Sequence, residues 1–250
     1  MVNGSLVSDT FTDSNALYDL GKAYLPGGVT GPGRKADPDI GHPFYVQRAQ
    51  GSRIWDVEGR EYIDFQTSFG AALLGHGHPA VSAALQRAIA QGNLCALETE
   101  EHIQAARKLC EAVPAFDMVR FSGSGTETTW HVVKLARAFT GKEKIVKLEG
   151  HFHGFNEYLQ YNMTPPLDRA LPNVHVESPG FPRSAEELVY VLPFNDLEAV
   201  EALLVKHHDE IAAIILEPVN YNPGCILPLP GYLEGLRNLT RQYDVLLIFD

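Results

Sequence analysis

The stretch Ser122-Gly123-Ser124-Gly125-Thr126-Glu127 stands between an apolar run and a helical pattern. Residues 118–122 are predicted to form a strand, and apolar residues recur with helical spacing over residues 127–140. Ser124 and Glu127 have the spacing of a capping box, so the helix should begin at Ser124. The stretch is therefore predicted to be a glycine-rich turn from the end of a strand to the start of a helix.

Such a turn has the features of a phosphate-binding site. Unpaired backbone N–H groups meet the positive end of the helix dipole there, and glycines let the backbone approach closely. Ser124 and Thr126 would add hydroxyl donors. The stretch matches neither GxxxxGK[ST] nor GxGxxG, so taken alone it is more typical of a purely structural turn than of a ligand site.

The composition is that of a globular protein. The chain has 250 residues, 45% of them hydrophobic, and a formal net charge of -11. An acidic balance argues against binding nucleic acid or an anionic membrane. Cys95, Cys110 and Cys225 form no CxxC pair and are predicted to be reduced thiols. With no signal-peptide pattern and no apolar run long enough to span a membrane, we expect a cytoplasmic protein.

The first part of the chain is predicted to belong to a smaller α+β region. Residues 1–75 form this N-terminal segment, and residues 76–250 a large domain that is incomplete at its C-terminus. Two alternating runs, 54–57 and 61–65, predict a β-hairpin. Residues 25–33 are too rich in glycine and proline for a regular element. Helices are predicted at 15–24, 79–91 and 99–110.

From residue 118 onward, apolar runs alternate with amphipathic helices, and an irregular stretch runs from 149 to about 193. Strands are predicted at 118–122, 144–148, 211–216 and 245–249, and helices at 127–140, 197–207 and 231–243. This alternation predicts an α/β fold with a mostly parallel sheet covered by helices. Ligands of such sheets bind at the carboxyl ends of the strands, where residues 122–126, 149–154 and 217–224 and Asp250 should meet.

Three side chains stand out near these strand ends. Phe152 lies between His151 and His153 directly after a strand. The two histidines could be metal ligands, but their spacing supplies only two and no cysteine joins them. Phe152 could pack under the sheet edge, or it could stack on a flat cofactor.

Carboxylates end two of the apolar strands, at Glu217 and Asp250. A carboxylate at the end of a buried strand needs a cationic partner, and a protonated heterocyclic nitrogen is one. Phosphate donors, a stacking ring and an acid for a ring nitrogen together predict pyridoxal 5'-phosphate.

The sequence resembles the class III, fold-type I pyridoxal-phosphate aminotransferases. The branch it resembles most holds glutamate-1-semialdehyde 2,1-aminomutase and the β-amino-acid aminotransferases. The resemblance covers nearly the whole chain from Leu25. It rests on Pro26-Gly27-Gly28-Val29, Trp55-Asp56-Val57-Glu58-Gly59, Tyr62-Ile63-Asp64, Leu74-Gly75-His76-Gly77-His78-Pro79, Ser124-Gly125-Thr126-Glu127, His153-Gly154, Glu217-Pro218-Val219 and Ile248-Phe249-Asp250.

The resemblance implies two sets of site residues. At the cofactor, the resemblance places Ser124, Gly125 and Thr126 at the phosphate and Phe152 on the ring. It places Asn222 near the 3′-oxygen. It places Asp250 at the ring nitrogen and gives it a catalytic role. Arg34 falls where this branch binds the substrate carboxylate. Phe69 falls where the aminomutase has a tryptophan beside the substrate.

Departures from the aminomutase pattern around Phe69, Phe152 and Asn220-Tyr221 favour a transaminase. It would pass the amino group of an amino acid, β-amino acids included, to a keto acid. Alternatives are an aminomutase of the glutamate-1-semialdehyde type and a non-catalytic protein of the same fold. The resemblance implies a homodimer. The spacing of the histidines predicts no resident metal, and the acidic composition predicts no nucleic acid or membrane partner.

None of the eight lysines lies where the family has its Schiff-base lysine, a few dozen residues past Asp250. We therefore expect either that the chain is the N-terminal part of a longer enzyme or that it lacks that chemistry.

Overall fold

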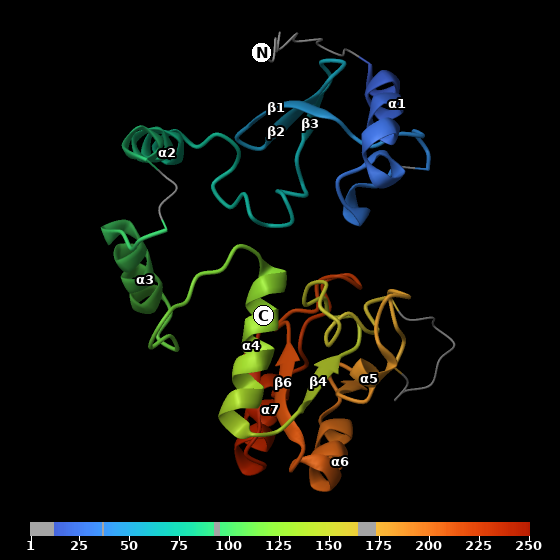
Figure 1. Cartoon of the computed structure of the whole chain (residues 1–250), viewed down its shortest axis with the longest axis vertical. Coiled ribbons are helices and arrows are strands. Elements are labelled where there is room, and N and C mark those ends of the chain that lie inside the picture. The colour runs from blue at the N-terminus through green and yellow to red at the C-terminus, as the bar shows by residue number, and fades with distance from the viewer. Residues whose placement is uncertain (1–12, 37, 93–95, 165–173) are drawn as a thin grey trace. The chain divides into compact units, whose positions relative to one another are not determined.

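A computed structural model describes residues 13–36, 38–92, 96–164 and 174–250, so Cys95 lies outside the described residues. The chain divides into two compact units, Met1–Glu100 and Glu101–Asp250 (Figure 1). The sequence instead predicts a domain boundary between residues 75 and 76, and that boundary stays a prediction.

The first unit contains a three-stranded antiparallel sheet. Its strands are β1 (Val46–Gln50), β2 (Arg53–Asp56) and β3 (Glu61–Ile63), in the order β1-β2-β3. The β2–β3 pairing confirms the predicted hairpin. Strand β1 was not predicted because its residues are mostly polar and show no apolar pattern. It is a strand because it pairs with β2.

Two helices accompany this sheet, and both confirm the sequence analysis. Helix α1 (Ser14–Tyr24) begins where the Asp13 carboxylate accepts a hydrogen bond from the Asn15 N–H. Helix α2 (Pro79–Gln91) has proline in its first turn and ends at Gly92. Between α1 and the sheet, the Gly/Pro-rich segment forms two short 3-10 turns, Pro26–Gly28 and Pro32–Arg34, where only a loop was expected.

The second unit is built on a parallel four-stranded sheet, as predicted. Its strands run in the order β5-β4-β6-β7. They are β4 (Lys144–Leu148), β5 (Val189–Leu192), β6 (Ile211–Leu216) and β7 (Leu246–Phe249). Its helices are α3 (Glu100–Ala112), α4 (Gly125–Thr140), α5 (Arg183–Glu186), α6 (Leu197–His207) and α7 (Tyr232–Gln242).

Helices cover both faces of this sheet (Figure 1). Helix α4 packs through Val133 and Ala136 against one set of alternating strand residues, which includes Ile145 and Ile215. Helices α6 and α7 pack against the other set. Because successive strand residues point to opposite faces, apolar residues at every position of β6 are buried from both sides.

Two predictions for this unit were wrong. Residues 118–122 do not form a strand, because no strand in the described part of the chain pairs with them; Met118 is 90% exposed. The stretch from 149 to 193 is not wholly irregular, since it ends in α5 and β5. Strand β5 is short, and it forms a strand because it pairs with β4.

A lysine is buried at the carboxyl end of β4. Lys147 is fully buried, and its Nζ donates hydrogen bonds to the carbonyls of His151, at 3.0 Å, and Tyr161. Burial lowers the pKa of Lys147 to about 7, although Glu177 and Glu217 act in the opposite direction. This side chain joins the loop after β4 to the segment that follows it.

This buried amine predicts a pH-dependent stability. From about pH 7 up to the usual lysine pKa of 10.5, the unfolded chain binds a proton at Lys147 that the folded chain does not. The free energy of unfolding contributed by this residue therefore rises with pH across that window, by on the order of a few kcal/mol. Urea unfolding of wild type and Lys147→Met at pH 6–10 measures the effect. The free energy of unfolding of wild type should increase relative to that of Lys147→Met as the pH rises. Lys134→Met, an exposed change on α4, is the control. A difference that stays constant with pH would contradict the assignment.

Candidate functional site

The start of α4 has the cap that the sequence predicts, with one difference. Ser124 Oγ accepts the Glu127 N–H at 3.1 Å, and the Glu127 carboxylate accepts the Gly123 N–H at 2.7 Å. In a strict capping box the glutamate would take the N–H of the serine itself. The N–H groups of Gly125 and Thr126 lie in the first helical turn, where no intrahelical acceptor exists. Among the described residues no hydrogen bond from these two N–H groups is seen, so they can be offered to an anion.

The loop after β4 lies directly against this helix start. Thr126 Oγ1 accepts the Phe155 N–H at 3.3 Å, and the Thr129 hydroxyl donates to the His153 carbonyl at 2.7 Å. Gly154 has φ +87°, and a Cβ placed on it would lie 2.6 Å from Thr126 Oγ1. Only glycine permits both that backbone conformation and that approach.

Asp250, which follows β7, is held by a buried histidine. His153 Nδ1 lies 2.7 Å from Asp250 Oδ2; the His153 side chain is fully buried, whereas that of Asp250 is 32% exposed. Burial lowers the pKa of His153, although its hydrogen bond to Asp250 acts in the opposite direction. The geometry assigns the imidazole proton to Nδ1, from which it is donated to the carboxylate. The hydrogen bond from His153 thus fixes the position of Asp250 Oδ2.

The loops after β4 and β6 are joined through Glu217. Its carboxylate accepts the N–H groups of Phe152, at 2.7 Å, and Tyr221, at 3.2 Å. Its own N–H donates to His151 Nδ1 at 2.8 Å. Burial, with His153 nearby, lowers the pKa of His151 to about 3, so this ring is neutral. The carboxylate that ends β6 therefore orients the loop that carries Phe152.

These contacts bring most of the predicted cofactor residues to one sheet edge. The phosphate-turn residues, Phe152 and Asp250 are linked by the hydrogen bonds above. The Phe152 ring packs edge-on against Phe155, with centroids 5.3 Å apart. Asn222 lies on an exposed turn after β6. The partnership of His153 with Asp250 was not foreseen. Among the residues the structure describes, no three His, Cys, Asp or Glu side chains are grouped to hold a metal ion.

The predicted substrate residues lie in the first unit, close to each other. Arg34 is exposed, and its Nη1 donates to Thr30 Oγ1 at 2.8 Å. The tip of the Phe69 ring lies 3.7 Å from the position of a Cβ built on Gly33. Arg34 and Gly33 line a cavity of about 760 Å³ together with Ser68, which precedes Phe69.

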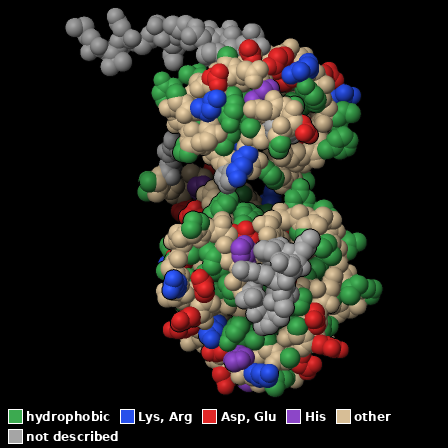
Figure 2. Space-filling view, turned by 90° about the vertical axis from the view of Figure 1, so that its right-hand side faces the viewer, with side chains coloured by type: hydrophobic (Ala, Val, Ile, Leu, Met, Phe, Trp, Pro, Cys, Tyr) green, Lys and Arg blue, Asp and Glu red, His purple; other side chains and the backbone are tan. Residues whose placement is uncertain are grey.

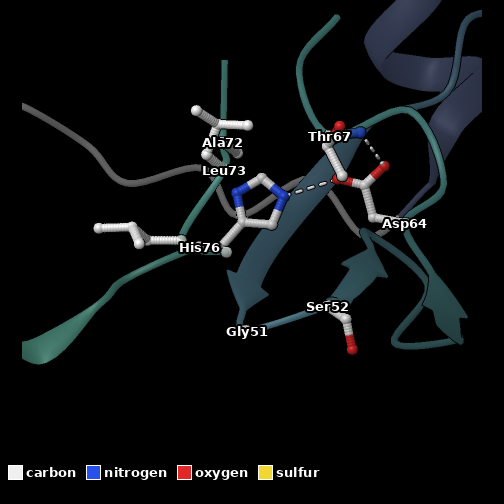
Figure 3. Close-up of a pocket in the computed structure, with 9 residues that line it drawn as sticks. Gly51, Ser52, Asp64, Thr67, Ala72, Leu73 and His76 are labelled. Atoms are coloured by element: carbon white, nitrogen blue, oxygen red, sulfur yellow. Dashed lines mark hydrogen bonds and ion pairs between the residues drawn. The ribbon is translucent and has the colours of Figure 1, made fainter. Parts of the chain in front are cut away.

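Phe69 sits in an unusual left-handed turn. Thr67, Ser68 and Phe69 have φ of 46°, 54° and 56°, and Gly70 completes the turn at 85°. Each non-glycine residue in this region costs roughly 1–2 kcal/mol, so other contacts must hold the turn. Asp64 supplies some of them (Figure 3). No pattern in the sequence marks Asp64 for a role in the site.

A sequence profile of the aminotransferase class-III family matches residues 36–250. The chain belongs to the class-III aminotransferase family. It is 41% identical over 246 residues to a glutamate-1-semialdehyde 2,1-aminomutase of Methanosarcina acetivorans, covering 98% of this chain and 57% of that protein. A protein of the same description from Syntrophomonas wolfei is 42% identical over 235 residues, covering 94% and 54%. The chain thus spans about half the length of these relatives.

Solved structures show the same class-III fold. An omega-transaminase from Sphaerobacter thermophilus superposes with a TM-score of 0.90 at 34% identity, covering 99% of this chain and 56% of that one. A β-phenylalanine aminotransferase from Variovorax paradoxus superposes with a TM-score of 0.79 at 30% identity, covering 95% and 50%. The predicted fold-type I architecture is confirmed. No helix among the described residues is long and apolar enough to cross a membrane.

Class-III aminotransferases use pyridoxal 5'-phosphate, and one solved relative holds it. The residues of this chain fit the group. The start of α4 offers N–H groups and hydroxyls to a phosphate, and Asp250 presents a carboxylate anchored by a buried imidazole. Bound at such a site, the cofactor supplies an electron sink whose ring nitrogen needs an acidic partner.

The close approach of Gly154 to Thr126 predicts a large cost for a methyl group. Gly154→Ala must push the loop off α4 or strain its backbone, whereas Gly141 has a similar φ of 72° with nothing within 4 Å of a Cβ placed on it. We expect Gly141→Ala to cost about 1 kcal/mol and Gly154→Ala at least about 2 kcal/mol more. Urea unfolding of the two variants measures the difference. Equal losses would mean that the loop and the helix start are not in tight contact.

Proposed function

We propose that this chain is part of a pyridoxal-phosphate-dependent aminotransferase that takes the amino group from an amino acid and passes it to a keto acid. The observation that carries the proposal is the His153–Asp250 pair at the sheet edge where α4 begins. A carboxylate fixed from behind by a buried imidazole, with one oxygen left for a ligand, suits a protonated ring nitrogen.

In this proposal the residues of the second unit bind and orient the cofactor. Ser124, Gly125 and Thr126 hold its phosphate through N–H and hydroxyl donors. Phe152 covers one face of its ring, and Asn222 lies near its 3′-oxygen. Asp250 holds the proton on the ring nitrogen, which is its catalytic role.

Arg34 and Phe69 of the first unit bind the substrate. A guanidinium offers two parallel N–H donors that match a carboxylate, and its loop is stiffened by proline. Phe69 would contact the hydrophobic part of the donor. A β-amino acid donor is supported by the likeness to a β-phenylalanine aminotransferase.

An aminomutase is the second candidate. The relatives at 41% and 42% identity are described as glutamate-1-semialdehyde 2,1-aminomutases. A mutase moves the amino group within one molecule, so it turns over without an external keto acid. Single-substrate turnover of the full-length protein would favour this candidate over the transaminase.

We propose that the protein is a cytoplasmic homodimer whose partners are the small-molecule donor and acceptor. Support for self-association comes from apolar side chains left uncovered on α4, where Leu135 is 65% and Phe139 78% exposed. Figure 2 shows hydrophobic side chains at the surface among charged ones on both units. Sedimentation of the active full-length protein as a monomer at micromolar concentration would contradict the dimer.

The role of Arg34 predicts a selective loss. In the full-length enzyme, Arg34→Ala should lower kcat/KM for an amino acid donor by a factor of about 30 or more if the bound substrate shields the Arg–carboxylate pair from water, since a shielded pair is worth about 2–4 kcal/mol. The loss should be much smaller if the pair stays exposed, as the Arg34 side chain is here. An amine that lacks the carboxylate should be used almost as well as before. Arg34→Lys should recover only part of the loss.

Arg53→Ala is the matched control, since Arg53 makes an exposed ion pair with Glu61 in the same unit. It should leave both donors unaffected. Equal losses for the two donors in Arg34→Ala would show that Arg34 merely anchors its loop, and would sink the assignment of an amino acid substrate.

A further inference from the structure

The left-handed turn at Thr67–Gly70 needs an anchor, and Asp64 provides it. The Asp64 carboxylate accepts the N–H groups of Gln66 and Thr67, both at 2.9 Å through Oδ1. The other oxygen, Oδ2, lies 2.7 Å from His76 Nε2. Figure 3 shows the two interactions of the Asp64 carboxylate, one with the His76 imidazole and one with the Thr67 N–H. One carboxylate thus connects the turn to His76, 12 positions after Asp64.

His76 is itself fixed to the antiparallel sheet. Its backbone N–H and carbonyl both pair with Gly51, each at 2.8 Å, and Gly51 lies in the turn between β1 and β2. Gly75 approaches so closely that a Cβ built on it would lie 2.9 Å from the Gly51 carbonyl oxygen. The imidazole therefore projects from a rigid position, and the carboxylate bound to it has little freedom.

The Asp64–His76 pair is largely shielded from water, which strengthens the hydrogen bonds that Asp64 accepts. The side chains of His76 and Asp64 are 21% and 9% exposed. The hydrogen bond from His76, followed by that from the Thr67 N–H, lowers the pKa of Asp64, so the carboxylate is ionised at neutral pH. An ionised acceptor makes stronger bonds to backbone N–H groups than a neutral one.

The turn held in this way sets the position of Phe69. The tip of the Phe69 ring lies 3.7 Å from the position of a Cβ built on Gly33, the residue before Arg34. Asp64 and His76 also line the cavity of about 760 Å³ that Arg34 and Gly33 line. A turn that relaxed out of the left-handed region would move Phe69 away from Gly33 and reshape this cavity.

We propose that Asp64 and His76 are positioning residues for substrate recognition, which hold the Thr67–Gly70 turn so that Phe69 and Arg34 present one surface to the donor. The inference rests on the proposed function, since it takes Arg34 and Phe69 as the substrate contacts. It gives Asp64 and His76 a role that needs no contact with the reacting atoms.

The test compares Asp64→Ala, Asp64→Asn and His76→Ala in the full-length holoenzyme. Amide hydrogen exchange should show the Thr67 N–H exchanging about 10-fold faster or more in Asp64→Ala. For an amino acid donor KM should rise by about 10-fold, while kcat/KM for the matching amine without a carboxylate changes less than about 3-fold. Asp64→Asn keeps an oxygen that can accept both N–H groups, so it should fall between wild type and alanine.

Glu61→Gln is the matched control, because it removes a carboxylate from an exposed ion pair on β3 and should change neither measurement. If Asp64→Ala fails to fold, the asparagine variant decides the question by the same donor comparison. Equal losses for both donors, or faster exchange at Thr67 with an unchanged donor ratio, would overturn the positioning role. Selective loss in Arg34→Ala without one in the Asp64 variants refutes this inference alone. No selective loss in Arg34→Ala refutes the proposed function and this inference with it.

Discussion

No side chain of β6 is in contact with water, and the rest of the second unit follows from that constraint. All residues from Ile211 to Leu216 are 0% exposed. Burying each large aliphatic side chain contributes about 1.5–3 kcal/mol, but only if both faces of the strand are covered. Helix α4 covers one face and helices α6 and α7 the other. Polar groups are thereby excluded from the strand and appear at its end, where Glu217 begins the site.

The parts of the fold that periodicity controls could be predicted from the sequence. Helix α6 and strand β6 have the predicted bounds, because an amphipathic or wholly apolar pattern leaves one way to bury the apolar surface. Strand β1 was missed because Val46–Gln50 is mostly polar and becomes a strand only by pairing with β2. The strand expected at 118–122 was wrong for the opposite reason: its sequence has the pattern but the described chain offers no partner.

The residues of the candidate site could be named from motifs, but the contacts that orient them could not. His153 and Asp250 are 97 positions apart, and Phe152 and Glu217 are 65 apart. A linear pattern does not show which side chains meet across strand ends. Asp64 and His76, 12 positions apart, form the corresponding pair in the first unit. In the second unit the predicted contact residue Asp250 is hydrogen-bonded by a buried imidazole, and in the first unit the Asp64–His76 pair is hydrogen-bonded to the turn that contains Phe69. Polar partners of this kind hold binding residues in a fixed geometry.

We propose that the start of α4 and Asp250 hold the two ends of one pyridoxal phosphate. A crystal structure of the full-length protein with the cofactor tests it most directly. We expect the phosphate on the N–H groups of Gly125 and Thr126, and the ring nitrogen at about 2.8 Å from an Asp250 oxygen, with His153 Nδ1 still on the other. A phosphate bound away from α4, or a ring nitrogen that faces another group, would contradict the claim.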